Sequence, residues 1–299
     1  MQTTLGIVGA GRVGRALGRR LRELGWKVGA VVTRNESSAK GAVRFIGDGR
    51  PLTVLSRRIL ASSVILVATP DAAIEEIARE LARIGGEEWA GHVVLHTSGA
   101  LDSGVLRAVR ECGASTGSMH PLQTFSGVAV PPLEGKVFAI EGDAIAVRVA
   151  RRIARALGGA PTPIDPNRKP LYHAAGALAA GHALVVVEAA VQLMMSSLGL
   201  KRGEAVRALL PMTKQVLQNC ERLGPRAAWT GPLARGDHKV VAKHLHVLAQ
   251  YSPQYGDAYE ALNRLAEHVL TRDTADGSPS VATVKENNKA KVQYLGSKG

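Results

Sequence analysis

The sequence Gly9-Ala10-Gly11-Arg12-Val13-Gly14 decides the fold of this chain. It follows an apolar run at 5–8 that is short enough for a buried strand, and it precedes residues 15–21, which have the pattern of an amphipathic helix. In a strand–turn–helix unit of this type, Gly9 permits the tight turn, Gly11 lets the backbone approach a pyrophosphate, and Gly14 lets the helix pack closely on the strand. The free N–H groups at the helix start then face the phosphates. The motif therefore predicts a dinucleotide-binding site at this turn.

The part of the chain up to residue 165 alternates strands and helices. Strands are predicted at 5–8, 27–32, 64–68, 93–95 and 137–140, helices at 74–84, 105–109 and 144–157, and the segment 117–119 is expected to lead into a loop. Runs such as 64–68 are apolar throughout, as in parallel sheets that are covered on both faces. The alternation predicts a doubly wound parallel sheet, that is, an α/β Rossmann domain over residues 1–165.

A cluster of prolines at 161–170 marks the end of this pattern. Beyond it only helices are predicted, so we expect an all-α C-terminal domain at 166–272 for substrate binding and dimerisation, followed by a polar tail at 273–299. The apolar stretch 174–200 carries His182, Glu188 and Gln192, which favours a buried helix over a membrane span. Since such a helix needs cover on several sides, we expect a homodimer through the helical domain and no membrane partner.

Composition argues against several other classes of protein. Cys112 and Cys220 have neither disulfide nor zinc spacing, so no metal site is predicted and a reducing, cytoplasmic location is expected. No signal peptide is recognisable at the start of the sequence. The net charge of +13 is spread over both halves of the chain and aromatic residues make up only 4%, which argues against nucleic-acid binding. We interpret the charge as a general attraction for anionic cofactors and substrates.

The residues after the strand predicted at 27–32 indicate which dinucleotide is bound. NAD sites place an acid there for the ribose 2′-hydroxyl, whereas NADP sites lack it and offer an arginine. Arg34 and Ser37 suit a 2′-phosphate, although Glu36 lies close to the position of the NAD acid. The sequence therefore predicts NADP, with NAD as the alternative. The complete set of predicted cofactor residues is Gly9, Gly11, Arg12, Val13, Gly14, Thr33, Arg34, Ser37, Ala68, Thr69 and Pro70.

Polar residues at further strand ends, and at the start of the long helix, form the predicted active site. His120 is the predicted proton donor to a carbonyl or imine, because its unperturbed pKa suits that role; a histidine that only fixes a loop is the alternative. Lys169 is predicted to polarise a carbonyl or bind a carboxylate, although an exposed first-turn lysine fits equally well. Ser98 is expected to orient the substrate. Further substrate-binding residues are expected at Thr97, Gln123, His173 and Arg235.

Several stretches of the sequence resemble one family. They are GIVGAGRVG at 6–14, HTSGAL at 96–101, SMHPLQTF at 118–125, YHAAGALAAGHALVVVEAA at 172–190 and TGPLARGD at 230–237. The chain is similar to a two-domain family of NADP oxidoreductases that joins a Rossmann-like domain to its own helical C-terminal domain. That family lies within the superfamily of pyrroline-5-carboxylate reductase, prephenate dehydrogenase and the β-hydroxyacid dehydrogenases. The resemblance implies catalysis in a cleft between domains and dimerisation through the helical domain.

The resemblance carries over to individual residues only in part. β-Hydroxyacid dehydrogenases open their long helix with a lysine, which Lys169 matches, but they have an asparagine where His173 stands here. Arg235 and Asp237 replace residues of the substrate loop of pyrroline-5-carboxylate reductases, which implies a different substrate. The sequence thus predicts an NADP-dependent oxidoreductase that acts on a small, anionic carbonyl or imine substrate. The alternative is a nucleotide-binding regulatory or assembly protein without turnover.

Overall fold

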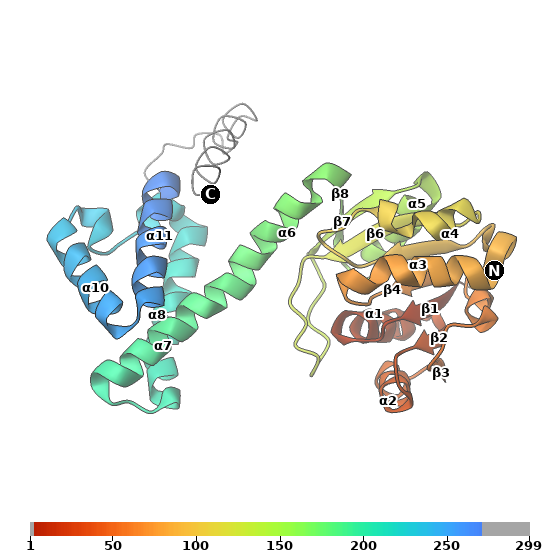
Figure 1. Ribbon diagram of the computed structural model, residues 1–299, viewed down its shortest axis with the longest axis horizontal. Helices are drawn as coiled ribbons and strands as arrows, with labels where there is room; N and C mark the ends of the chain where they lie inside the picture. The colour runs from red at the N-terminus through yellow and green to blue at the C-terminus, as the bar shows by residue number, and fades with distance from the viewer. Residues whose placement is uncertain (1–2, 271–299) are drawn as a thin grey trace, which may run out of the picture. The chain divides into compact units, whose positions relative to one another are not determined.

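The computed structural model describes residues 3–270, and the chain divides between Ala183 and Leu184 into two compact units (Figure 1). The boundary predicted at 165/166 marks the end of the sheet, whereas the division between the units falls inside the long helix that follows. The tail predicted at 273–299 lies outside the described residues.

The first unit is built on an eight-stranded sheet in the order β3-β2-β1-β4-β5-β6-β7-β8. The chain runs outward from β1 through β2 to β3 and then crosses to β4, on the other side of β1. All neighbours are parallel except β6 and β7, which are antiparallel. The strands are β1 (Thr4–Val8), β2 (Lys27–Val32), β3 (Arg50–Leu52), β4 (Val64–Val67), β5 (Val93–His96), β6 (Ser115–Pro121), β7 (Val137–Gly142) and β8 (Ala160–Pro163).

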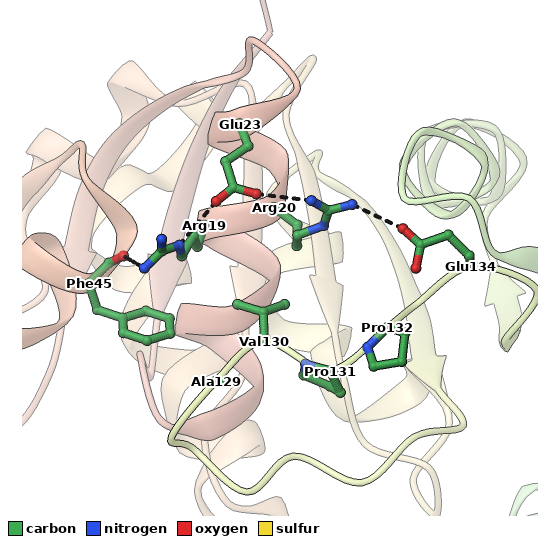
Figure 2. Close-up of a pocket in the computed structure, with 9 residues that line it drawn as sticks. All are labelled: Arg19, Arg20, Glu23, Phe45, Ala129, Val130, Pro131, Pro132 and Glu134. Carbon is green, nitrogen blue, oxygen red and sulfur yellow. Dashed lines mark hydrogen bonds and ion pairs between the residues drawn. The ribbon is translucent and has the colours of Figure 1, made fainter.

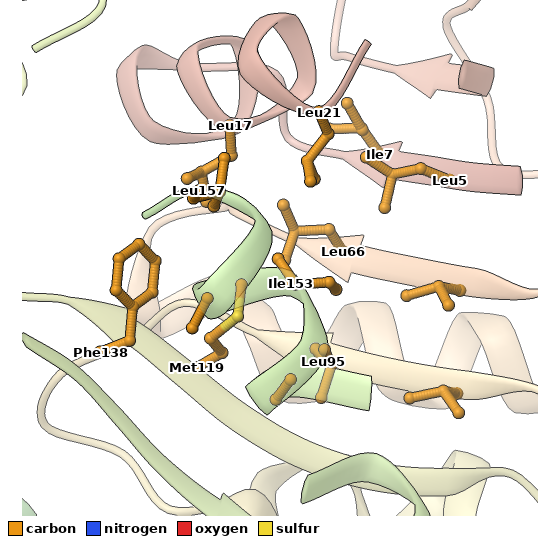
Figure 3. Close-up of a cluster of buried hydrophobic side chains, with 14 of the residues drawn as sticks. Leu5, Ile7, Leu17, Leu21, Leu66, Leu95, Met119, Phe138, Ile153 and Leu157 are labelled. Carbon is orange, nitrogen blue, oxygen red and sulfur yellow. The ribbon is translucent and has the colours of Figure 1, made fainter. Parts of the chain in front are cut away.

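Helices cover both faces of this sheet, and one apolar cluster fills the space beneath each set. Figure 3 shows the first cluster, in which Leu17 and Leu21 of α1 lie over side chains of β1 and β4. The central strands are apolar on both faces because both faces are covered. The helices of the first cluster are α1 (Arg12–Glu23), α2 (Glu36–Ile46) and α5 (Ala144–Ala156); those of the second are η1 (Arg57–Ala61), α3 (Asp71–Gly85), η2 (Gly86–Trp89), η3 (Ser103–Leu106) and α4 (Arg107–Glu111).

This architecture confirms the predicted Rossmann domain, with differences at its far edge. The expectation that 117–119 leads into a loop is wrong, because these residues lie inside β6 and pair with β7. Strand β8 arises from the proline cluster itself, at 160–163. Proline is tolerated there because β8 is an edge strand that pairs only with β7, so missing N–H groups cost little.

A long helix leads from the first unit into the second. It begins with the turn η4 (Pro166–Arg168) and continues through α6 (Lys169–Ala177), one π-helical turn η5 (Leu178–His182) and α7 (Ala183–Leu198). The second unit is helical throughout its described residues, as predicted. Its remaining helices are α8 (Arg202–Leu223), α9 (Pro225–Ala228), η6 (Leu233–Arg235), α10 (His238–Tyr251) and α11 (Pro253–Leu270).

The expected burial of the long helix is not found within a single chain. Val191 is the one buried residue of α7, while Leu184 and Val185 are 67% and 65% exposed. Within residues 3–270, one helix, Pro166–Leu198, is long and apolar enough to cross a membrane, and 6% of its most apolar window is buried. Length and composition alone are weak evidence for a span. The other described helices of the second unit leave every residue of α7 except Val191 at least partly exposed.

Candidate cofactor site and active site

The glycine turn lies between β1 and α1, where the strand order of the sheet reverses. Gly9 has a φ of +85°, and a Cβ added to it would lie 2.7 Å from the Thr69 amide nitrogen. A Cβ on Gly14 would lie 2.5 Å from the Gly9 carbonyl oxygen, so neither position accepts a side chain. A Cβ on Gly11 would meet nothing within 4 Å. Open space therefore lies beside the start of α1, and the turn fits a pyrophosphate.

The other predicted residues of the pyrophosphate region adjoin this turn. The Ala68 amide donates to the Val8 carbonyl at 2.8 Å, which holds the residues after β4 beside β1. Thr69 Oγ1 is buried and has no hydrogen-bond partner among the residues that the structure describes. An orphaned hydroxyl at this place can bind a ligand. Arg12 is exposed at the first position of α1, and Pro70 stands at the N-cap of α3.

The residues predicted to hold a 2′-phosphate lie in the loop after β2 and in the first turn of α2. Arg34 and Ser37 are exposed there, and Thr33 Oγ1 donates to the Asn35 carbonyl at 2.9 Å. Glu36, the residue that weighed against NADP, lies 2.6 Å from Lys40 on the same helix. This ion pair lowers the pKa of the Glu36 carboxyl group. Glu36 is thus paired with a lysine of its own helix, and Arg34 is an exposed cation beside it.

Three side chains meet at the end of β6. His120 Nδ1 lies 2.9 Å from the Tyr172 hydroxyl, and the rings of His120 and His173 are edge-to-face with centroids 5.7 Å apart. Gly99 permits this approach, since an added Cβ would lie 2.5 Å from His173 Cδ2 and 2.9 Å from His120 Nε2. Tyr172 is not among the predicted site residues. Tyr172 and His120 are 52 residues apart in the sequence, so no local sequence pattern predicts their contact.

The environment changes the charge state expected for this group. Burial lowers the pKa of His120 to about 4, with smaller contributions from the nearby His173 and Lys169. Burial raises the pKa of Tyr172 to about 12. The unperturbed pKa assumed for His120 from the sequence is therefore wrong for this site. Both members of the His120–Tyr172 pair are neutral near pH 7, so His120 does not act there as an imidazolium.

Lys169 is completely buried, and the alternative of an exposed first-turn lysine is wrong. Its Nζ donates to the Ser98 carbonyl at 3.2 Å and to Ser118 Oγ, and it lies 3.9 Å from Glu141 Oε1. Burial lowers the pKa of Lys169, and the charge of Glu141 opposes that shift. Glu141 Oε2 accepts from Ser103 Oγ at 2.7 Å. Lys169 therefore joins the start of α6 to β5, β6 and β7 and does not face open space.

Ser98 is also fully engaged within the fold. Its Oγ donates to Asp71 Oδ2 at 2.8 Å and accepts from the Leu101 amide at 3.0 Å. His96 lies beneath it, with Nδ1 accepting from the Ser98 amide at 3.2 Å and Nε2 donating to the Asp102 carbonyl at 3.1 Å. Burial lowers the pKa of His96 to about 3, so this ring is neutral. These contacts fix the backbone on which Gly99 lies.

The remaining predicted substrate residues are spread over both units. Thr97 is half-buried just after β5. Gln123 Nε2 donates to the Pro132 carbonyl at 2.9 Å and thereby holds the loop between β6 and β7. Arg235 belongs to the second unit, where it lies 3.1 Å from Asp237. Residues 3–270 contain no cluster of three side chains that could hold a metal ion.

A surface pocket of about 450 Å³ lies between α1, the end of α2 and the loop between β6 and β7 (Figure 2). Its charged side chains neutralise one another, since Arg20 lies 3.0 Å from both Glu23 and Glu134. Arg19 also pairs with Glu23 and lies over the Phe45 ring. None of the predicted site residues lines this pocket. The candidate site therefore remains at the carboxyl ends of the strands, where the glycine turn and His120 lie.

Two family models match successive parts of the chain. Residues 1–121 match a family described as a Rossmann-like domain, which agrees with the dinucleotide-binding architecture of the first unit. Residues 136–266 match a family described as a domain of unknown function, DUF2520. The pairing confirms the two-domain family that the motifs predicted. No curated protein matches the sequence.

Solved structures match over nearly the whole chain. A Bacteroides fragilis protein provisionally assigned as an NADP oxidoreductase is 22% identical, with a TM-score of 0.74 and coverage of 89% of this chain and 98% of its own. A Thermotoga maritima protein is 24% identical, with a TM-score of 0.66 and coverage of 89% and 98%. A reductive aminase from Aspergillus terreus, in complex with NADPH and ethyl-5-oxohexanoate, is 17% identical, with a TM-score of 0.63 and coverage of 90% and 93%. At these identities the likeness establishes the fold alone.

Proposed function

We propose that this chain is an NADP-dependent oxidoreductase that acts on a small carbonyl or imine compound, with NAD as the alternative cofactor. One observation carries the proposal: the open glycine turn at Gly11 and the His120–Tyr172–His173 group occupy the carboxyl ends of strands in one sheet. The NADPH complex of the Aspergillus terreus reductive aminase supports the choice of cofactor and of reaction. A bound nicotinamide supplies or accepts a hydride, and the chain's own residues must move the matching proton.

In this proposal His120 exchanges that proton with the oxygen or nitrogen of the substrate. Lys169 and Ser98, which were also predicted to be catalytic, do not exchange a proton with the substrate in this proposal. Lys169 bonds to the Ser98 carbonyl and to Ser118 of β6, the strand that carries His120. Ser98 fixes the turn that contains Gly99, against which both imidazole rings lie. We therefore assign Lys169 and Ser98 as positioning residues.

Substrate binding is assigned to exposed and half-buried groups. His173 is exposed beside His120, and Thr97 and Gln123 lie at the ends of β5 and β6. These side chains offer hydrogen bonds to a polar substrate. For an anionic substrate, the sequence predicts Arg235 as the cationic binding residue.

We further propose a cytoplasmic homodimer formed through the helical unit. Apolar side chains of α7 and α8 stand exposed in the single chain, among them Leu184, Val185, Met212 and Leu217. A second copy of the same surface would remove them from water. Light scattering at micromolar concentration is expected to give the mass of a dimer, and Val185→Glu is expected to reduce it to that of a monomer. A monomeric wild type would refute this assembly.

Calorimetric titration with NADPH, followed by NADPH oxidation against a panel of keto acids and cyclic imines, tests the activity. Gly11→Val should abolish cofactor binding in a folded protein. His120→Gln should lower turnover about 10²–10⁴-fold with little change in NADPH affinity. His92→Gln, a change to a half-buried histidine bonded only to the Leu60 carbonyl, serves as the matched control. Tight NADPH binding without turnover on any substrate would instead favour a regulatory or assembly protein.

A further inference from the structure

The Tyr172 hydroxyl is hydrogen-bonded to Nδ1 of His120, the ring nitrogen that faces away from Gly99. We propose that Tyr172 donates to Nδ1 of His120, fixes the ring as the Nε2–H tautomer, and passes a proton through the imidazole to the substrate. This inference rests on the proposed function. Because Tyr172 acts through His120, it is a positioning residue in a two-residue proton relay.

The geometry leaves the two ring nitrogens of His120 with different tasks. Nδ1 is occupied by the Tyr172 hydroxyl at 2.9 Å. Nε2 makes no hydrogen bond to any residue of the described part of the chain, and it faces the bare Cα of Gly99. The tautomer of a neutral histidine is set by the bond that its other nitrogen makes. A tyrosine that donates to Nδ1 therefore leaves a proton on Nε2, the ring nitrogen that has no hydrogen-bond partner among the described residues.

The charges around the ring favour a neutral pair. Helix α6 contributes Lys169, Tyr172 and His173 to the surroundings of His120, and β5 contributes the neutral His96. On β7 the residue opposite His120 is Ala139, which does not titrate. The buried cation of Lys169 and the desolvation of the ring both disfavour an imidazolium. Neutral His120 and protonated Tyr172 then persist together across the physiological pH range.

A neutral imidazole that gave up its Nε2 proton alone would become an imidazolate, which is a stronger base than a phenolate. The relay avoids that species. As a hydride reaches the carbon of the substrate C=O or C=N bond, the π electron pair moves to the heteroatom, which takes the proton from Nε2. Nδ1 takes the proton from the Tyr172 hydroxyl, leaving a phenolate. After product release, water protonates Nε2, and Nδ1 returns its proton to the tyrosine oxygen.

The chain contains a natural control for this arrangement. In the second unit His244 Nδ1 lies 3.0 Å from the Tyr259 hydroxyl, with nearly the same edge-to-face ring contact. His244 is exposed and Tyr259 is half-buried, and no glycine contact with this imidazole is found. Tyr259→Phe therefore removes an equivalent hydrogen bond away from the candidate site. Comparison with this variant distinguishes the effect of losing any His–Tyr hydrogen bond from the effect of losing the proposed relay.

Long-range ¹H–¹⁵N NMR of the full chain, labelled at histidine, tests the inference without any substrate. In the wild type we expect His120 to carry its proton on Nε2 from pH 6 to 9. Tyr172→Phe should mix the two tautomers and raise the pKa of His120, because the lost donor stabilised the neutral ring. Tyr259→Phe should change only the signals of His244. A proton on Nδ1 in the wild type, or an unchanged His120 in Tyr172→Phe, would overturn the relay.

A kinetic measurement then separates failure of the relay from failure of the proposed function. With NADPH and a substrate that is turned over, Tyr172→Phe should lower kcat by about 10-fold or more, within the range of general acid catalysis, and leave KM and NADPH affinity unchanged. Tyr259→Phe should leave kcat unchanged. A wild-type kcat in Tyr172→Phe overturns the relay while the oxidoreductase stands. Absence of binding of both NADPH and NADH overturns the oxidoreductase, and with it the catalytic use of the pair, whatever the tautomer of His120.

Discussion

Replacement of Lys169 by methionine tests whether a buried ion pair fastens the long helix to the sheet. Lys169 is 0% exposed and Glu141 is 6% exposed. Methionine keeps the apolar stem of the lysine side chain but removes the charge and the hydrogen bonds to Ser98 and Ser118. The Glu141 carboxylate would then remain in the interior without its cation. Ser103 would still donate a hydrogen bond to Oε2, and Oε1 would have no hydrogen bond, as in the wild type.

The expected cost follows from that stranded charge. Removing one partner of a buried pair destabilises a protein by about 3–5 kcal/mol, whereas replacing both partners is close to neutral. The 3.9 Å separation from Glu141 is long for an ion pair, so the lower end, about 3 kcal/mol, is expected. At about 2–4 °C per kcal/mol for a domain of this size, Lys169→Met should lower the Tm of the first unit by roughly 6–12 °C. Adding Glu141→Gln should restore most of the loss.

Tryptophan fluorescence during urea unfolding can follow the first unit alone. Trp26 and Trp89 lie in the first unit and Trp229 lies in the second, so all variants are made in a Trp229→Phe background. Buried Trp89 donates to the Leu81 carbonyl at 2.7 Å and reports loss of the core. A cost below about 1 kcal/mol for Lys169→Met, or a double variant no more stable than the single one, would refute the buried-pair account.

Three further predictions concern the same unit. Arg34→Ala should weaken NADP binding more than NAD binding in calorimetric titration, since the guanidinium serves the 2′-phosphate; equal losses would exclude that role. Gly99→Ala should lower turnover and displace the NMR signals of His120, because the new Cβ would lie 2.5 Å from His173 Cδ2; wild-type kinetics would contradict the contact. The pKa values of His96 and His120, about 3 and 4, lie below the usual 6.5, so the unfolded chain binds more protons. The free energy of unfolding should therefore fall as the pH drops from about 6.5 towards 4, by at most about 1.4 kcal/mol per pH unit for each histidine. His96→Gln should remove the part of this pH dependence that comes from His96. A free energy of unfolding that does not change over this pH range would rule out both pKa shifts.

The parts of the fold that were predicted correctly have strong local signals. The turn at 9–14 is recognisable from its glycine spacing. A Cβ on Gly14 would meet the carbonyl oxygen of Gly9, five residues back, whereas the contacts of Gly9 itself are with the distant residues Ala68 and Thr69. The apolar run at 64–67 forms β4 because any such run between helices must be buried on both faces. These features depend on the chain's own periodicity, so they can be seen before the chain folds.

The elements that were missed owe their form to distant partners. Strand β6 begins Ser115-Thr116-Gly117-Ser118, a polar sequence that pairs with both β5 and β7. Its buried polar groups are tolerated because they find bonds far along the chain: Thr116 with Asp143, and Ser118 with Lys169. Neither bond can be predicted from spacing alone, and the same is true of the contact between His120 and Tyr172.

The charge of the site limits the substrates that it can hold. The ammonium group of Lys169 is buried and lies near the opposite charge of Glu141. It helps to lower the pKa of His120, but it is not exposed to a ligand. The His120–Tyr172 pair is neutral, which suits the transfer of a proton and offers an anion only hydrogen bonds. A carboxylate on the substrate would gain little from these groups. A preference for anionic substrates would require a cationic side chain outside this group, and the sequence suggests Arg235. Arg235→Ala is expected to remove such a preference and to leave the turnover of neutral substrates unchanged.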